Sequence, residues 1–368
     1  MNLSVGIVGL PNVGKSTLFN ALLKKQQALA ANYPFATIEP NVGVVAVPDE
    51  RLEKLAEIVK EEEKMSSLPP IKNALIEFVD IAGLVKGASE GAGLGNKFLS
   101  HIREVKIIAH VVRVFEDPDV IKEGAVDPKA DYEVIRAELI IADLQTVEKQ
   151  RESKAVKTDA VKKSAVEKLY KGLNEGKSAF DVDLTDEERE SVNDLFLLTN
   201  KPEIIVLNVS ENQYNPEGIT KVTKEYQEIL KQVQDDNIVV ICAQIESELA
   251  ALSDEEAKDY LKELGLEKSG LERLIQKAYD GLGLISFLTA GEKEVKAWTI
   301  QKNLDAQHAA GAIHTDFIKK FIKAEVVSFQ DYVATGGRKK AREVGKARLE
   351  GKDYVVQDGD VIEFKIGA

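Results

Sequence analysis

The chain has 368 residues, of which 44% are hydrophobic and 30% charged, and its formal net charge is −13. This composition is typical of a globular protein of two or three domains, and no run of about 18 apolar residues occurs that could span a membrane. The acidic charge disfavours a general nucleic-acid coat but allows a local basic patch on one domain, and no DNA partner is expected. The single cysteine, Cys242, excludes an internal disulfide, and with an N-terminus that lacks a signal-peptide pattern it predicts a cytoplasmic protein.

Strands alternate with helices in the first part of the chain. Residues 3–8 form an apolar run that leads through a glycine-rich turn into a helical pattern from Lys15 to Leu23. Further strand-like runs, with helical patterns between them, occur at residues 74–79, 107–115, 204–207 and 238–242. This alternation predicts an α/β fold with a doubly wound, mostly parallel sheet, built from residues 1–126 and 200–281.

The alternation is interrupted over residues 127–199. Apolar or small side chains recur there at steps of three and four, at Ile135, Leu139, Ala142 and Thr146 and again at Ala165, Leu169 and Leu173. We therefore expect a helical coiled-coil insertion in which two helices pack on each other by a narrow apolar stripe. The insertion is either an inert elaboration of the fold or a protruding arm for a partner.

Residues 282–368 have a third pattern. Short strands are expected at residues 297–300, 324–328, 353–356 and 361–366, separated by glycine-rich turns and by one helix over residues 315–323. This pattern predicts a small α+β domain at the end of the chain.

A phosphate-binding loop is predicted between the first strand and the first helix. The segment Gly9-Leu10-Pro11-Asn12-Val13-Gly14-Lys15-Ser16-Thr17 matches the pattern G-x-x-x-x-G-K-[ST]. Its glycines allow backbone N–H groups to surround phosphates, Lys15 supplies a cation to the β- and γ-phosphate oxygens, and Ser16 offers a hydroxyl to Mg²⁺. The predicted contacts to the nucleotide here are made by Asn12, Val13, Gly14, Lys15, Ser16 and Thr17.

Two further elements fit the same chemistry. Asp80 and Gly83 form a D-x-x-G pattern at the end of a predicted strand, where the carboxylate would hold Mg²⁺ through water and the glycine N–H would sense the γ-phosphate. Thr37 lies in the loop after the first helix, so Ser16, Thr37 and Asp80 are the predicted magnesium ligands. Lys15, Asp80 and Gly83 are the predicted catalytic residues.

The base-recognition segment indicates adenine in place of guanine. GTPases of this class carry N-K-x-D after a later strand, whereas this chain has Asn208-Val209-Ser210-Glu211. A carboxylate displaced by one methylene loses the bidentate geometry that guanine requires, and Asn208 can match the adenine N6 amine and N7. Ala243 and Gln244, after the next strand, are expected to form the other wall. ATP is therefore the predicted substrate.

The motifs together resemble those of the YchF/Obg-like ATPase family. The resemblance rests on GLPNVGKST, NYPFATIEPN, DIAGLVKGASEGAGLGNKFL, NVSE and RLEGKDYVVQDGDVIEF, and it covers essentially the whole chain. It implies a Ras-like nucleotide domain, an inserted helical coiled-coil domain and a C-terminal TGS domain. It also implies ATP preference, slow intrinsic hydrolysis and association with ribosomes, through rRNA or a ribosomal protein, in translation or stress control.

The sequence offers no general base. Leu84 stands where many GTPases place a water-orienting glutamine, and Lys122 aligns with a histidine that has been considered catalytic in some members of the family that the chain resembles. His110 lies within an apolar run and is interpreted as a core residue. We therefore expect electrostatic catalysis by Lys15 and Mg²⁺. Asn12 is a predicted ligand for a second cation, K⁺, because P-loop proteins with asparagine at this position often use it; the alternative is that Asn12 only stabilises the turn of the loop.

Three interpretations of the function are open at this point: an ATPase that works as a switch, a nucleotide-responsive binding module with incidental hydrolysis, and an ordinary GTPase. For the partner, the segment from Gly337 to Lys352 carries seven basic residues against two acidic ones. It is either a solvated basic face or a contact to RNA or the ribosome. Its basic residues are Arg338, Lys339, Lys340, Arg342, Lys346, Arg348 and Lys352.

Overall fold

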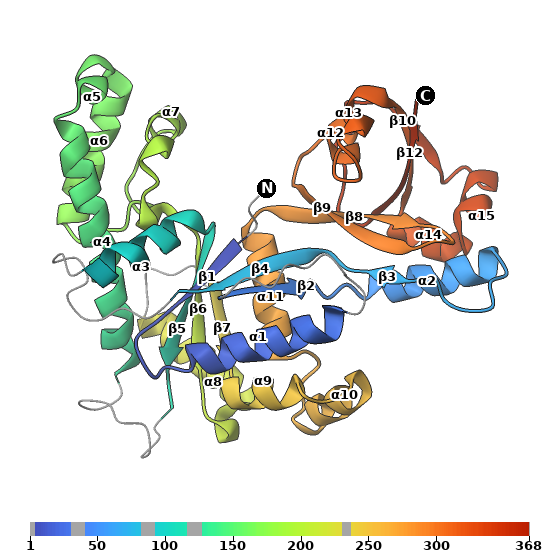
Figure 1. Ribbon diagram of the computed structural model, residues 1–368, viewed down its shortest axis with the longest axis horizontal. Coiled ribbons are helices and arrows are strands. Elements are labelled where there is room, and N and C mark those ends of the chain that lie inside the picture. Colours follow the sequence, from blue (N-terminus) through green and yellow to red (C-terminus); the bar gives the residue numbers. More distant parts are fainter. Residues whose placement is uncertain (1–3, 31–40, 82–92, 116–126, 230–236, 368) are drawn as a thin grey trace. The chain divides into compact units, whose positions relative to one another are not determined.

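The computed structural model describes residues 4–30, 41–81, 93–115, 127–229 and 237–367 (Figure 1). The chain divides into two units, each with its own six-stranded sheet. The first unit consists of Met1–Ala28, Phe35–Val44 and Glu77–Ala278, and the second consists of Leu29–Pro34, Val45–Ile76 and Tyr279–Ala368.

The first sheet has the strand order β2-β4-β1-β5-β6-β7. Its strands are β1 (Ser4–Val8), β2 (Val42–Ala46), β4 (Leu75–Asp80), β5 (Ile107–Arg113), β6 (Glu203–Asn208) and β7 (Ile238–Ile241). The pairs β1–β4, β1–β5, β5–β6 and β6–β7 are parallel. Every residue of β1, β5 and β7 is buried, as expected for parallel strands that are covered on both faces. The predicted parallel sheet is confirmed, and β2 is an additional strand.

Helices connect these strands. They are α1 (Lys15–Ala30), α3 (Gly93–Glu104), α8 (Pro216–Ile229), α9 (Ala243–Leu249), α10 (Asp254–Glu263) and α11 (Gly270–Gly281). Because the strands run parallel, their carboxyl ends share one edge of the sheet, and the loops that follow β1, β5, β6 and β7 meet there. In the part of the chain that the structure describes, no helix is long and apolar enough to cross a membrane.

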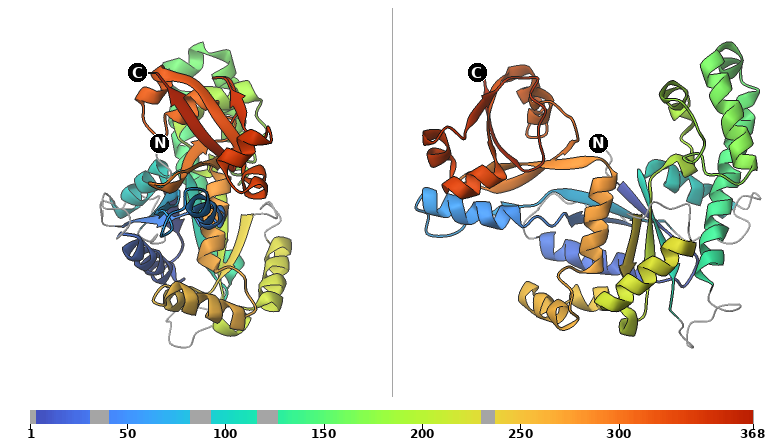
Figure 2. Two further views of the ribbon diagram at one scale, coloured as in Figure 1. Left: turned by 90° about the vertical axis from the view of Figure 1, so that its right-hand side faces the viewer. Right: turned by 180° about the vertical axis from the view of Figure 1, so that it is seen from behind.

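The predicted helical insertion forms between β5 and β6. Its helices are α4 (Pro128–Arg151), α5 (Lys154–Thr158), α6 (Ala160–Asn174) and α7 (Asp186–Ser191), followed by the short 3₁₀ helices η2 (Asn193–Leu195) and η3 (Leu198–Asn200). Asp127 caps α4 by accepting a hydrogen bond from Ala130 N, and Pro128 follows at the first helical position. Figures 1 and 2 show α4 and α6 side by side.

The apolar stripe of α4 packs differently from the prediction. Ile135, Leu139 and Ala142 belong to the core of the nucleotide domain, together with Val8 and residues of α3. The face of α4 that meets α6 is formed by Ile140 and Val147 instead. Helical spacing identifies a buried face but not the partner that buries it, and α4 is long enough to serve two partners.

A buried carboxylate fixes the end of the insertion to its first helix. Asp143, on α4, accepts hydrogen bonds from Leu198 N (2.7 Å), Thr199 N (2.8 Å) and Thr199 Oγ1 (2.6 Å). Burial raises the pKa of this carboxyl, while the three donors act in the opposite direction. The chain is thereby fixed to α4 immediately before it re-enters the sheet at β6.

The second unit contains a sheet with the order β11-β10-β12-β8-β9-β3. Its strands are β3 (Ile71–Lys72), β8 (Leu284–Ala290), β9 (Val295–Gln301), β10 (Phe321–Ser328), β11 (Arg348–Glu350) and β12 (Asp360–Ile366). Its helices are α2 (Arg51–Glu62), α12 (Ala306–Ala310), α13 (Asp316–Lys320), α14 (Phe329–Thr335) and α15 (Arg338–Glu343). The predicted α+β class is confirmed.

Several details of this unit differ from the prediction. Residues 353–356 form no strand, because only Val355 makes a bridge, to Asp305. The predicted helix over residues 315–323 ends at Lys320, where β10 begins and pairs with β12. Sheet pairing in these short segments overrides local helical preference.

Residues 45–76 belong to the second unit, although the prediction placed them in the nucleotide domain. The short β3 pairs in parallel with β9, and α2 lies against β8, β9 and α14. Arg51 forms ion pairs with the nearby Asp49 Oδ1 (2.8 Å) and with Asp358 Oδ2 (2.7 Å), and the second pair links this segment to the end of the chain. The strand β3 pairs with a strand some 220 positions later in the chain, and no local sequence pattern reveals such a pairing.

Candidate functional site

The loop between β1 and α1 has the geometry that a phosphate site requires. Gly14 has φ +97°, a backbone conformation that L side chains rarely adopt. A Cβ atom at this position would also lie 2.2 Å from Asn208 Nδ2. Conformation and space therefore both demand glycine, and the loop passes directly into the N-terminus of α1, where free N–H groups favour an anion.

Asn208 ties this loop to the neighbouring one. Its amide is 3% exposed, Nδ2 donates to Val13 O (2.9 Å), and Oδ1 accepts from Ala243 N (3.0 Å). Both ends of the side chain thus hold backbone, from the phosphate loop on one side and the start of α9 on the other. The sequence predicts that Asn208 reads adenine. The structure instead gives its amide a positioning role, and a direct contact to the base stays a prediction.

A cavity of about 770 Å³ opens at this edge of the sheet. It is lined by Asn12, Gly14, Lys15, Ser16, Thr17, Phe115, Asn208, Val209, Ser210, Glu211, Asn212, Cys242, Ala243, Gln244, Ser247 and Glu248. The fold thus brings together the loop after β1, the loop after β6 and the start of α9, as the motif positions predict. Val13 does not line the cavity, because its side chain is buried and its carbonyl is held by Asn208.

Lys15 lies at the closed end of the loop. It is 8% exposed and donates from Nζ to Leu10 O (2.6 Å). Burial lowers the pKa of Lys15, and the carboxylate of Asp80 partly opposes this shift. Burial likewise raises the pKa of Asp80, against the attraction of Lys15. The two groups therefore interact across the site, and a phosphate anion would raise the pKa of Lys15 and oppose the effect of its burial.

The predicted magnesium site is only partly described. The hydroxyl of Ser16 lines the cavity, and Asp80 interacts with the neighbouring Lys15. Both offer the hard oxygen donors that Mg²⁺ prefers, so they fit this ion when it arrives with a triphosphate. Thr37, Gly83, Leu84 and Lys122 lie outside the described residues.

Sequence reasoning missed Phe115, Ser210, Asn212, Cys242, Ser247 and Glu248, which line the same cavity. Phe115 follows β5, and the Arg113 guanidinium lies 4.6 Å from its ring centroid and donates to its carbonyl (2.9 Å). Burial raises the pKa of the Cys242 thiol, which keeps it protonated. The rule that the carboxyl ends of parallel strands meet at one edge of the sheet could have identified Phe115 and Cys242, since each is the last residue of a predicted strand.

His110 takes no part in this site. It is 1% exposed on β5, pairs with Glu203 Oε1 through Nδ1 (2.8 Å), and stacks on Tyr132 with ring centroids 5.0 Å apart. The interpretation of His110 as a core residue with a polar partner is confirmed.

The basic segment of the second unit is largely neutralised by carboxylates of the same unit. Arg338 and Arg342 both pair with Glu325 (3.2 and 2.8 Å), a residue of β10 that is 7% exposed. Ion pairs also hold Lys339 to Glu63, Lys346 to Asp331 and Arg348 to Glu350. The +5 balance counted along the sequence is therefore not a +5 surface, and within the described residues only Lys340 and Lys352 of this segment form no ion pair.

A phosphate loop that joins a central parallel strand to a helix, with a cavity at the carboxyl edge of the sheet, defines the class of P-loop nucleotide triphosphatases. Comparison with known proteins specifies the class further. The family model MMR_HSR1, described as 50S ribosome-binding GTPase, matches residues 4–163, and YchF-GTPase_C, described as a protein of unknown function (DUF933), matches residues 284–367.

Full-length relatives carry the same name. The chain is 50% identical over 375 residues to the ribosome-binding ATPase YchF of Bacillus subtilis and 47% identical over 371 residues to that of Escherichia coli O157:H7, with 99% of each chain covered in both cases. The solved structure of the Schizosaccharomyces pombe YchF GTPase is 38% identical and superposes with a TM-score of 0.85, covering 99% of this chain and 98% of that one. The chain belongs to the YchF family.

The bridge made by Asn208 has a testable consequence. We expect Asn208→Ala to weaken binding of ATP and of GTP by a similar factor, about tenfold each, because it leaves Val13 O and Ala243 N unpaired and loosens both walls. Calorimetry with the two nucleotides measures this. Asn174→Ala, which removes an exposed amide on α6 away from this cavity, is the matched control and should bind both nucleotides as wild type does. A loss confined to ATP would assign Asn208 to base reading instead.

Proposed function

We propose that this protein binds and hydrolyses Mg-ATP and acts as a nucleotide-dependent switch on the ribosome. The observation that carries the proposal is the cavity in which the phosphate loop, with the partly desolvated Lys15, faces the loop that has lost the guanine code. The relatives are named ribosome-binding ATPases, and the proposal extends that activity and partner to this chain.

The phosphate end of the site follows from its charges. Lys15 leaves Leu10 O to contact the β- and γ-phosphates, and the loop N–H groups surround the β-phosphate. Ser16 and Asp80, with Thr37, would hold Mg²⁺, which neutralises charge that develops on the phosphate oxygens. The Gly83 N–H would sense the γ-phosphate. Leu84 and Lys122 offer no general base, so we expect slow turnover by electrostatic stabilisation.

The base end favours adenine by exclusion of guanine. Val209 is buried and replaces the lysine of the guanine code, while Glu211 is exposed at the rim. The Glu211 carboxylate extends one methylene further than an aspartate and cannot approach guanine N1 and N2 in the same way. The S. pombe relative is called a GTPase and the bacterial ones ATPases, which makes a direct comparison of the two nucleotides decisive.

ATP is expected to bind about tenfold more tightly than GTP, equivalent to about 1.4 kcal/mol, because the phosphates supply most of the affinity for both. Titration calorimetry measures the ratio, and GTP binding as tight as ATP would overturn the assignment. In the same preparation Lys15→Ala should abolish turnover and weaken binding. Lys24→Ala, which removes an exposed lysine later on α1, should retain turnover.

A monovalent cation is proposed beside the phosphates. Asn12 lines the cavity, is exposed and has φ +60°, so its side-chain carbonyl is available to an ion at the mouth of the loop. We expect faster ATP hydrolysis in KCl than in NaCl at equal ionic strength, because K⁺ suits a loose cage of oxygens. Asn12→Ala should lose this preference, and Asn212→Ala, which removes another amide on the cavity, should keep it. Equal wild-type rates in the two salts would remove the potassium role.

The paired basic residues change how a ribosome contact should be tested. Removing Arg338 or Arg342 would leave Glu325 with less compensation in the interior, so a loss of binding would reflect unfolding. Lys340 and Lys352 are both exposed, and removing them costs little stability. They are the better probes of an electrostatic contact to rRNA or a ribosomal protein.

Lys340→Ala/Lys352→Ala should therefore weaken co-sedimentation with ribosomes and flatten its dependence on KCl, with an unchanged melting temperature. The exposed pair Lys258→Ala/Lys262→Ala on α10 is the control. Repeating the sedimentation with ATP, ADP and a non-hydrolysable analogue separates a switch that requires hydrolysis from a module that responds to binding alone. If Lys340→Ala/Lys352→Ala sedimented with ribosomes as wild type does, the contact would be excluded.

A further inference from the structure

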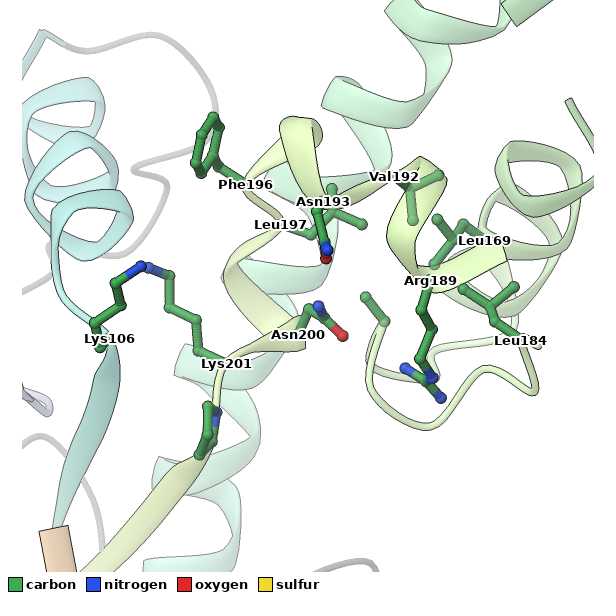
Figure 3. Close-up of a pocket in the computed structure, with 12 residues that line it drawn as sticks. Lys106, Leu169, Leu184, Arg189, Val192, Asn193, Phe196, Leu197, Asn200 and Lys201 are labelled. Carbon is green, nitrogen blue, oxygen red and sulfur yellow. The ribbon is translucent and has the colours of Figure 1, made fainter. Parts of the chain in front are cut away.

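A second cavity, of about 220 Å³, lies in the first unit where the helical insertion meets the sheet (Figure 3). Lys106 immediately precedes β5, and Lys201 lies two residues before β6. The cavity is therefore at the amino-terminal edge of the sheet, whereas the nucleotide cavity is at the carboxyl edge. The six residues of β6 separate the two edges by about 20 Å, so the two cavities are distinct.

The charged residues that line this cavity are all cations. They are Lys106, Arg189 and Lys201, with the amides of Asn193 and Asn200 between them and no carboxylate. Figure 3 shows the ammonium groups of Lys106 and Lys201 pointing toward one another, with Arg189 on the opposite side. Two adjacent ammonium groups repel each other unless an anion lies between them.

Two of the three cations are held in place by hydrogen bonds to the backbone. Lys201 Nζ donates to Arg103 O (2.9 Å) and to Val105 O, at the end of α3, and Arg189 donates to Phe180 O (3.3 Å) and Val182 O (3.2 Å). These bonds go to neutral carbonyls, so they orient the charges without neutralising them. Lys201 and Arg189 therefore meet no carboxylate in these contacts.

The rest of the lining is apolar and includes an unusual aromatic residue. Leu169, Leu184, Val192 and Leu197 contribute to one side of the cavity, and Phe196 lies at its margin. Phe196 is 65% exposed and has φ +47°, a left-handed conformation that is rare for a bulky residue. A strained backbone that displays an aromatic ring to solvent is a feature associated with ligand contacts.

We propose that this cavity binds a nucleotide unit, either a free nucleotide or a residue of single-stranded RNA, with its phosphate at Lys106 and Lys201 and its base at Phe196. Phosphate suits paired ammonium groups, and a planar base suits an exposed ring, whereas a simple anion would use only the first feature. The inference does not depend on hydrolysis at the other cavity.

The protonation of Lys201 supports this arrangement. Burial and the repulsion of Lys106 and Arg103 lower the pKa of Lys201 to about 8, against the attraction of Asp143. A phosphate between the ammonium groups would raise this pKa. Because the bound state needs the charged lysine, affinity is lost as the pH rises through about 8.

The test is the binding of a fluorescent hexanucleotide RNA, followed by anisotropy, to wild type and to Lys15→Ala; because Lys15→Ala disables the nucleotide cavity only, binding at the second cavity should be the same in both. We expect Lys106→Ala to weaken binding severalfold and to lower the slope of log affinity against log salt by about 0.7, the loss of one phosphate contact. Phe196→Gly, which suits the left-handed backbone, should weaken binding about tenfold without loss of stability. Lys163→Ala, which removes an exposed lysine on α6, is the matched control and should bind as wild type.

Two further arms identify the ligand. Displacement of the RNA by AMP would assign the cavity to free nucleotides, and failure of AMP to displace it would assign the cavity to RNA. Lys201→Arg should bind with less dependence on pH between 7 and 9. Equal binding by wild type, Lys106→Ala and Phe196→Gly, or equal displacement by an acidic peptide, would overturn the proposal, while ATP turnover measured in parallel reports on the other cavity alone.

Discussion

The amide of Asn208 holds the nucleotide cavity together. Loops that follow separate strands of a parallel sheet converge at one edge, but convergence alone does not fix their spacing. Here one buried side chain donates to the phosphate loop and accepts from the first turn of α9, so three loops are held at defined distances. The absence of a side chain at Gly14 makes room for this bridge. The phosphate end and the base end of the cavity are thus parts of one hydrogen-bonded arrangement, and the fold preorganises both before a nucleotide binds.

How far the sequence predicts this structure depends on how local each signal is. The phosphate loop, the parallel strands and the approximate extent of the helical insertion were all predictable, because glycine spacing and apolar runs act within a few residues. The contacts of the Asn208 amide were not, since Val13 and Ala243 lie far from it in the chain. The same holds for the apolar stripe of α4, whose period was read correctly while its partner was not. Residues 45–76 were placed in the wrong unit because β3 pairs with a strand from the other end of the chain.

Charge is the property for which counting along the sequence misleads most. The basic segment of the second unit suggests a binding surface, yet most of its cations meet carboxylates of β10, of Glu63 directly after α2, and of neighbouring elements. The cavity at the amino-terminal edge of the first sheet gives the opposite case. Its three cations come from three separate places in the sequence, so no window reveals them, and the fold leaves them without a carboxylate on the lining. In an acidic protein, local electrostatics are set by which charges the fold brings together.

The long helix of the insertion has a mechanical consequence. Its first half is embedded in the core of the nucleotide domain, its second half carries α6, and Asp143 fastens the returning chain near the junction. A helix of 24 residues is about 36 Å long and stiff on that scale. Because α4 is one continuous helix, a small tilt of its first half, imposed by the core that surrounds it, would tilt its second half by the same angle. The far end of the insertion would then move further than the core does. The insertion is therefore built as a lever arm rather than as a tethered domain.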